Sequence, residues 1–337
     1  PRLNADFLKW TMAFNNSCSE KNVSKAIPAI RDINLLSRDL YSDIREEEHF
    51  NFQLKKDGLL MLCKTEHMLE EEAHVLALAN KEGLPARMLS AEEVQQKMPN
   101  AKLDIKGAAF YECDHHTTPG EFMEELKTLL QAKGVHFVKN EKVIDFDSSS
   151  DTLSNVKTAS GKTFVADEVI LATGAWAGEL NKKLGLKILM QAGKGYRINS
   201  TTETGITLPS ILCEAKVAVT PMNGFTRFAG TMEIAGINHN INKARVEAIA
   251  EAVPRYFKNV VITEQEKDEA QCGLRPVTPD GLPYIGRPSK WKNLTIAAGH
   301  AMMGWSLGPG TGLLVSEIID GKKPSLDLSV YNPDRRF

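Results

Sequence analysis

The spacing of apolar side chains along the chain predicts several amphipathic helices. Between Val23 and Ile44 the apolar residues recur at steps of three or four, the period of one buried helix face. A similar stripe begins at Thr118, a suitable cap, and Pro119, which fits a first turn, and it ends at Gly134. Further helices are expected at residues 66–81, 242–257 and 309–320.

Shorter apolar runs bounded by turn-forming residues predict strands between these helices. "VHFV" from Val135 and "KVIDF" from Lys142 are interpreted as strands, and more are expected between residues 188 and 228. Residues 50–63 predict a β-hairpin, because the intervening sequence KDG is typical of a tight turn. Since strands and helices alternate without one dominating, the expected fold class is mixed α/β or α+β.

Composition and charge exclude several classes of function. Lys plus Arg number 41 and Asp plus Glu 43, so the net charge of −2 offers no basic surface for nucleic acid. No apolar run approaches the roughly 18 residues that would predict a transmembrane span. The chain of 337 residues is long enough for two domains. Its five scattered cysteines, with no C-x-x-C, predict reduced thiols, as in a cytoplasmic protein.

The sequence "CDHH", Cys113 to His116, has the residue types of a metal site. No second pair of ligands follows at a usual spacing, so no metal is expected. The favoured interpretation is a strand end that runs into a loop.

Apolar and aromatic residues gather near the start of the chain, at Phe7, Leu8, Trp10 and Phe14. They are candidates for a face that touches a membrane or for ordinary core, and core is favoured.

The glycine-rich stretch "GHAMMGWSLGPGTG", Gly299 to Gly312, is expected to connect a strand to a helix. A helix N-terminus offers unpaired N–H groups and the positive end of a dipole. These suit a phosphate or the carbonyl-bearing side of a planar cofactor. The spacing differs from G-x-x-x-x-G-K-[ST], which argues against a nucleotide triphosphatase. His300 on this stretch is either functional or a packed histidine with satisfied nitrogens.

A second stretch, "GLRPVTPDGLPYIG" from Gly273 to Gly286, places Arg275 among apolar residues. The following proline holds Arg275 in extended backbone, and its planar fork of donors suits a carboxylate. Arg275 could equally be structural and paired with a buried Asp or Glu. The strand "VILATGAW" ends in Thr173-Gly174, where small residues allow either close approach to a ligand or a tight turn.

Four stretches in this order, "ATGAW", "QAGKGY", "GLRPVTPDGLPYIGR" and "LTIAAGHAMMGWSLGPGTG", resemble the FAD-dependent amine oxidoreductases. That family includes D-amino acid dehydrogenase, glycine oxidase and D-amino acid oxidase. The resemblance implies two interleaved domains, with a mostly antiparallel sheet in the substrate domain. The FAD-binding domain is expected at residues 1–46, 116–176 and 265–337, and the substrate domain at residues 47–115 and 177–264.

The resemblance also implies an activity. The expected reaction is oxidation of the α-amine of small D-amino acids by hydride transfer to flavin N5, giving an imino acid and then a 2-oxo acid and ammonia. An oxidase of the same family, acting on glycine, sarcosine or D-proline, is the alternative. Electrons would pass to a quinone, another carrier or oxygen. The expected location is cytoplasmic, with peripheral contact at the inner membrane.

Site residues follow from the matching motifs. At the catalytic centre the resemblance implies Arg275, which would bind the substrate carboxylate, and His300. Val143 is expected to meet the adenine through its backbone, and the segment near the dinucleotide comprises Thr173, Gly174 and Trp176. The loop residues expected to line the isoalloxazine ring are Gly299, His300, Met302, Met303, Gly304, Trp305 and Ser306. Gly273 is expected to be a further cofactor-binding residue. The region corresponding to a family substrate tyrosine, "KVAVTP", has none, so a second carboxylate anchor stays open, with Tyr196 nearby in sequence.

One departure from the family pattern concerns the cofactor. A G-x-G-x-x-G turn, which receives the pyrophosphate in the family, does not occur in these 337 residues. The sequence therefore resembles a family member without its N-terminal dinucleotide-binding unit. The corresponding alternative is a truncated, FAD-free and inactive fragment.

Overall fold

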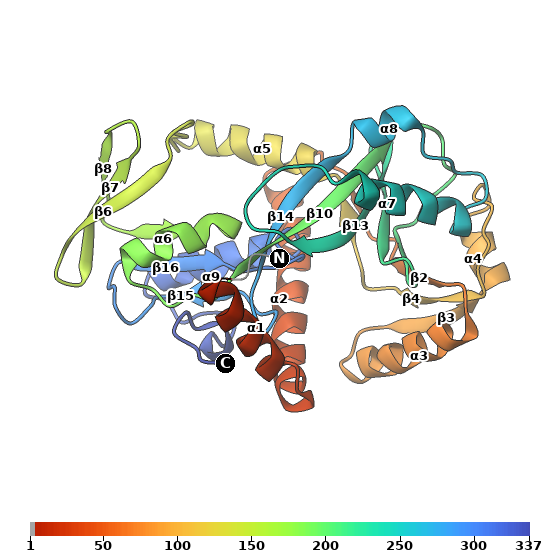
Figure 1. Ribbon diagram of the computed structural model, residues 1–337, viewed down its shortest axis with the longest axis horizontal. Helices are drawn as coiled ribbons and strands as arrows, with labels where there is room; N and C mark the ends of the chain where they lie inside the picture. The colour runs from red at the N-terminus through yellow and green to blue at the C-terminus, as the bar shows by residue number, and fades with distance from the viewer. Residues whose placement is uncertain (1–3) are drawn as a thin grey trace.

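The computed structural model describes residues 4–337 and has a mixed α/β architecture (Figure 1). Its helices are α1 Ala5–Ser17, α2 Glu20–Glu47, α3 Glu66–Lys81, α4 Ala91–Lys97, α5 Pro119–Ala132, α6 Ala177–Leu184, α7 Lys243–Tyr256, α8 Glu264–Asp268 and α9 Gly308–Ile319, with short 3-10 turns η1 Gly174–Trp176 and η2 Ser329–Tyr331. Its strands are β1 Leu54–Lys55, β2 Leu59–Cys63, β3 Ala86–Ser90, β4 Gly107–Tyr111, β5 His116–Thr117, β6 Val143–Ser149, β7 Thr152–Thr158, β8 Thr163–Val165, β9 Val169–Leu171, β10 Gln191–Ser200, β11 Ser210–Leu212, β12 Val217–Met222, β13 Phe225–Ile234, β14 Gln271–Val277, β15 Tyr284–Gly286 and β16 Leu294–Ala298.

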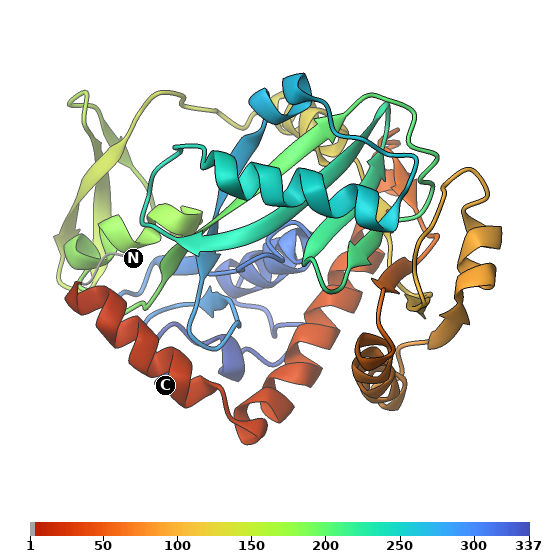
Figure 2. The ribbon, with the colours of Figure 1, turned by 45° about the vertical axis from the view of Figure 1, so that its right-hand side comes forward.

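The largest sheet has eight strands in the order β14-β10-β13-β12-β11-β2-β4-β3 (Figure 2). Every neighbouring pair is antiparallel except β11 and β2, which run parallel. The expected mostly antiparallel sheet is therefore confirmed. It draws strands from three separate parts of the chain, so its order could not be read from local sequence.

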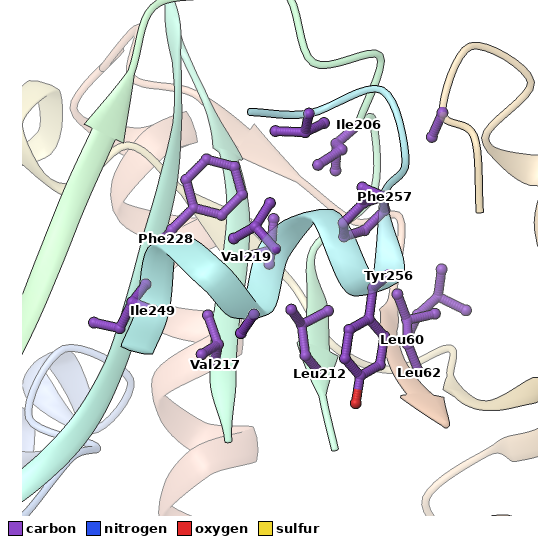
Figure 3. Close-up of a cluster of buried hydrophobic side chains, with 14 of the residues drawn as sticks. Leu60, Leu62, Ile206, Leu212, Val217, Val219, Phe228, Ile249, Tyr256 and Phe257 are labelled. Atoms are coloured by element: carbon purple, nitrogen blue, oxygen red, sulfur yellow. The ribbon is translucent and has the colours of Figure 1, made fainter. Parts of the chain in front are cut away.

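Helix α7 covers one face of this sheet and encloses a hydrophobic core (Figure 3). Phe228 on β13 is completely buried there, between Val219 on β12 and Ile249 on α7. Because side chains alternate along a strand, every second residue points to the opposite face. That opposite face carries Gly193, Arg275 and their neighbours and is called the site face below.

Helix α2 runs through the middle of the molecule and packs against α9 (Figure 1). The N–H of Gly310 at the start of α9 donates to Ser37 Oγ at 2.8 Å. Gly310 is required there, because a Cβ would lie 2.6 Å from that hydroxyl. Beside α9 lies a small sheet in the order β15-β16-β9, in which β16 and β9 are parallel. No helix in the part of the chain described here is long and apolar enough to cross a membrane.

Helix positions agree with the periodicity of the sequence. Helix α3 spans Glu66–Lys81 as predicted, and α4 begins with the capping box of Ser90 and Glu93. Helix α2 begins earlier than expected, because Ser19 caps it by accepting from the N–H of Asn22. Periodicity therefore located the helices, while the exact start of α2 is set by the cap at Ser19.

Two strand predictions are wrong. Residues 135–138 form an exposed, irregular segment, because no strand of residues 4–337 pairs with them. Residues 50–63 do not form a hairpin: β1 pairs with β5, whereas β2 pairs with β4 and β11. A strand is stabilised by its neighbours, and these neighbours come from distant parts of the sequence.

The division into domains stays a prediction. Residues 265–337, expected in the FAD-binding domain, include β14, which joins the eight-stranded sheet through β10. The same segment supplies β15, β16 and α9. Strand β14 thus connects the large sheet to the segment around α9.

The core under α7 gives a test of the fold. Phe228→Ala is expected to lower the free energy of unfolding by about 3–5 kcal/mol, because a completely buried phenyl ring is replaced by a cavity. Urea denaturation would measure the change. Val165→Ala is the control, since Val165 is 83% exposed and its loss should cost under about 0.5 kcal/mol. Equal losses in the two variants would contradict the described packing.

Candidate functional site

The glycine-rich loop between β16 and α9 lies against the end of β14. Val277 and His300 form an isolated antiparallel bridge, and the N–H of Ala301 donates to the carbonyl of Pro276 at 2.9 Å. Gly299 has a φ of 86°, and a Cβ there would lie 2.5 Å from the methyl carbon of Thr278. Glycine therefore allows the loop to approach β14, and the two stretches singled out from the sequence meet.

Arg275 points from β14 onto the site face without an acidic partner. Its Nη1 donates to the carbonyl of Thr231 at 2.9 Å, and no carboxylate in residues 4–337 forms an ion pair with it. Burial lowers the pKa of Arg275 from its ordinary value, yet arginine keeps its proton in proteins. The structure therefore does not support the alternative in which Arg275 forms a structural ion pair. A half-buried positive charge is left facing a space that an anion could fill.

A glycine on the neighbouring strand β10 makes room for this guanidinium. Gly193 is the register partner of Arg275, and Gly195 is that of Gly273. A Cβ on Gly195 would collide with the guanidinium group, whereas a Cβ on Gly273 would meet nothing within 4 Å. Sequence reasoning gave Gly195 no role, although the G-x-G spacing of "QAGKGY" was a signal of close approach.

Tyr196 lies on the other face of β10. It is 1% exposed, and its hydroxyl donates to Glu233 at 2.7 Å. Glu233 also pairs with Lys194, at 2.9 Å, and Lys194 is itself buried. Tyr196 therefore does not share the site face with Arg275.

His300 is tied to the helix that follows its loop. Its Nε2 is 2.9 Å from Thr311 Oγ1 on α9, so that nitrogen has a partner. Burial lowers the pKa of His300 to about 4, and the imidazole is neutral near pH 7. A neutral, partnered ring positions the loop, and the catalytic role predicted for His300 stays a prediction.

Met303, Trp305 and Ser306 of the loop line a cavity with a volume of about 720 Å³. Its opposite walls come from α2, including Tyr41, and from Met61 on the site face. The Trp305 side chain is fixed, because its indole N–H donates to Thr117 Oγ1 at 2.9 Å. The Trp305 carbonyl accepts from the Tyr41 hydroxyl at 2.8 Å.

The turn after β9 approaches the same region. Segment η1 packs beside β14, and Gly174 has a φ of 52° with nothing within 4 Å of a Cβ position. Trp176 is 42% exposed and stacks on His239. Thr173 Oγ1 is buried and has no hydrogen-bond partner among the described residues. An open turn with an unsatisfied hydroxyl is suited to contact a ligand.

The other predicted cofactor contacts lie at different places. Val143 begins β6, in a separate antiparallel sheet of β6, β7 and β8. Gly273 is exposed on β14, and Met302 is 69% exposed on the loop. The structure therefore gathers Arg275, the loop and η1, and leaves Val143 in another sheet.

The "CDHH" segment lies at a wall of the cavity. Cys113, Asp114 and His115 contribute to it, and His116 begins β5. Among residues 4–337 no group of three or more His, Cys, Asp or Glu side chains could hold a metal ion. All five cysteines are free, as the sequence predicted.

The apolar residues near the start of the chain divide between core and surface. Trp10 is 6% exposed, and its indole N–H donates to the carbonyl of Val277 at 3.0 Å. Leu8 and Phe14 on the same helix are 53% and 45% exposed. Trp10 therefore belongs to the core, next to the end of β14.

Comparison with known proteins places this geometry in a family. A family profile described as FAD dependent oxidoreductase, DAO, matches residues 13–318. A D-amino acid dehydrogenase of Helicobacter pylori is 31% identical over 322 residues, which cover 94% of this chain and 75% of that protein. A D-amino acid dehydrogenase of Bradyrhizobium diazoefficiens is 28% identical over 345 residues, and the match covers 99% of this chain and 80% of that protein.

Solved structures show the same fold. Glycine oxidase from Geobacillus kaustophilus superposes with a TM-score of 0.81 at 23% identity, over 91% of this chain and 83% of that one. L-Proline dehydrogenase from P. horikoshii gives a TM-score of 0.78 at 22% identity, over 89% and 81%. The chain belongs to the DAO family of FAD-dependent oxidoreductases, and its cofactor is FAD. The match over most of the chain favours an enzyme over an inactive fragment.

The described residues fit the ring end of this cofactor. In residues 4–337 nothing accepts from the backbone N–H groups of Gly304, Trp305 and Ser306, whereas those of Met303 and Leu307 are paired within the loop. Three consecutive free donors beside a cavity suit the carbonyl oxygens of an isoalloxazine ring. The residues that fit the cofactor are those of this loop and of the turn at Thr173.

The low pKa of His300 predicts a pH dependence of stability. The ordinary pKa of histidine is 6.5, whereas folded His300 has a pKa of about 4. As the pH falls below 6.5, His300 is therefore protonated in the unfolded chain but stays neutral in the folded one. The free energy of unfolding should therefore decrease between pH 6.5 and 4, by up to about 3 kcal/mol from this residue. His300→Gln should remove that part, as measured by urea midpoints at several pH values.

The control for this experiment is His67→Gln, because the His67 side chain is 78% exposed on α3. This variant should keep the pH dependence of the wild type. If wild type and His300→Gln lose stability in parallel on acidification, the buried neutral state of His300 is wrong.

Proposed function

We propose that this chain is an FAD-dependent dehydrogenase that oxidises the α-amine of small D-amino acids. The observation that carries the proposal is Arg275, a half-buried guanidinium held by the Thr231 carbonyl and without an acidic partner in the described part of the chain. A planar fork of donors is matched to a carboxylate, and every α-amino acid supplies one. The curated relatives named D-amino acid dehydrogenase support this substrate class.

Arg275 would act by binding and orientation. Two parallel hydrogen bonds to the α-carboxylate would fix the direction of the Cα–H bond, which lowers the entropic part of the barrier. Gly193 and Gly195 would keep the site face flat, so that the substrate can lie close to the strands. The neutral imidazole of His300 would hold the loop against Thr311 and stay uncharged at neutral pH.

The cofactor would be held by the loop and the turn already described. Bound FAD supplies a two-electron acceptor for the hydride of the substrate. The donors at Gly304, Trp305 and Ser306 would bind its ring carbonyls, and Thr173 with Gly174 would pass near the dinucleotide. Val143 would meet the adenine through its backbone. The imino acid product would then be hydrolysed by water to a 2-oxo acid and ammonia.

The proposed electron acceptor is a quinone or another carrier, which implies a cytoplasmic protein in peripheral contact with the inner membrane. The exposed Leu8, Met12 and Phe14 side chains of α1 offer an apolar surface for such contact. An oxidase would instead pass electrons to oxygen.

A spectroscopic experiment tests the reaction class. The purified holoprotein should show a flavin absorption spectrum that bleaches on anaerobic addition of D-alanine and stays unchanged with L-alanine. Recovery of the colour with a soluble quinone, and only slowly with oxygen, would identify the dehydrogenase. Fast recovery with oxygen and release of peroxide would identify an oxidase, and no bleaching with any D-amino acid would contradict the proposal.

Replacement of Arg275 tests the substrate anchor. Arg275→Gln should raise KM for D-alanine roughly 100-fold or more, because two charge-assisted hydrogen bonds of about 1.5–3 kcal/mol each are lost. Steady-state kinetics on the FAD-loaded enzyme measure this change. Arg287→Gln serves as the control, since Arg287 pairs with Glu168 at 2.9 Å and lies outside the site. A wild-type KM in Arg275→Gln would remove Arg275 from substrate binding.

A further inference from the structure

The strand that faces Arg275 contains a strained β-bulge. Along β10 and β13, Lys194 pairs with Glu233 and Tyr196 with Gly230, so Thr231 and Met232 together face Gly195. Two residues opposite one define a bulge. Thr231 has a φ of 60°, a conformation that is a genuine outlier for a β-branched residue.

The Thr231 side chain forms no hydrogen bond with the described residues in this conformation. Its Oγ1 is buried and has no hydrogen-bond partner among residues 4–337. An unsatisfied hydroxyl and a strained backbone are both unfavourable, so the rest of the structure must hold them in place. Toward the site, the Thr231 carbonyl of the bulge accepts a hydrogen bond from Arg275 Nη1 at 2.9 Å.

The bulge also decides which face receives Glu233. In a regular ladder continuing from the pair of Tyr196 and Gly230, Met232 would face Lys194 and Glu233 would face Gly193, the register partner of Arg275. The extra residue turns Glu233 to the opposite face. There Glu233 binds Lys194 at 2.9 Å and Tyr196 at 2.7 Å. A carboxylate is thereby kept off the face that carries the unpaired guanidinium.

We propose that Thr231 is a positioning residue for the substrate carboxylate. Its strained bulge holds Arg275 with a neutral carbonyl, and the space above Gly195 accommodates the guanidinium, so that the positive charge is oriented but not neutralised. This inference rests on the proposed role of Arg275 and adds a residue that acts through it.

Deletion of Thr231 tests the inference directly. The deletion leaves one residue opposite Gly195, so the ladder becomes regular while Glu233 still pairs with Lys194. In the FAD-loaded enzyme, KM for D-alanine and the Kd for benzoate, a carboxylate probe measured by calorimetry, should both rise about 10-fold. The value of kcat should change less than about threefold, because Arg275 and the cofactor loop remain.

Two single substitutions complete the test. Thr231→Gly keeps the carbonyl and adopts a positive φ without strain, so KM should stay within about twofold while Tm rises by on the order of 2 °C. Gly195→Ala should raise KM and the benzoate Kd as the deletion does, because its Cβ displaces the guanidinium. Gly120→Ala is the matched control, since a Cβ there meets nothing within 4 Å.

A double-mutant cycle with Arg275→Gln separates the two proposals. The effect of deleting Thr231 on benzoate binding should disappear when Arg275 is already replaced. An undiminished effect in that background, or wild-type KM and Kd in both the deletion and Gly195→Ala, would overturn the positioning role. If the deletion variant does not fold, Thr231→Gly decides: a KM raised well beyond twofold would show that the Thr231 side chain, and not its carbonyl, acts on the site, and would overturn the positioning role. An unchanged KM in Arg275→Gln itself would instead contradict the proposed function.

Discussion

The candidate site depends on one guanidinium that is bound without being neutralised. Arg275 is half-buried, yet its contact is a peptide carbonyl rather than a carboxylate. Removal of a charge from water is unfavourable unless a partner compensates. An ion pair would have offset that cost permanently and left no charge for a ligand. The surroundings of Arg275 are therefore those expected for a ligand-binding arginine and not for one that stabilises the fold through an ion pair.

The charges on the two faces of the sheet around β10 support the same conclusion. Lys194 and Arg275 lie on opposite faces of the large sheet. Lys194 is buried and Arg275 is half-buried. Lys194 has Glu233 and the side chain of Asn238 as partners. Among residues 4–337, Arg275 has only the Thr231 carbonyl. A single bulge accounts for this asymmetry, because it turns the acidic residue of β13 toward one cation and away from the other.

Much of this site could be predicted from sequence, and the remainder depends on contacts between distant segments. The stretches around Arg275 and Gly299 carried enough local signal to be singled out, and the structure brings them into contact. The partner of Arg275 could not be predicted, because Thr231 belongs to another strand and its conformation follows from strand register. The strand expected at residues 135–138 failed for a related reason, since a strand requires a neighbour and none is found among the described residues.

The choice of carboxylate as the recognised group has a consequence for turnover. The proposed reaction changes the amine and the Cα–H bond but leaves the carboxylate intact. Product and substrate would therefore present the same anion to Arg275, and the anchor would not distinguish them. Accumulated 2-oxo acid would compete for the enzyme, and release of product would rely on the difference between a tetrahedral and a planar Cα. The flat surface at Gly193 and Gly195 is the part of the site that could detect this difference in shape.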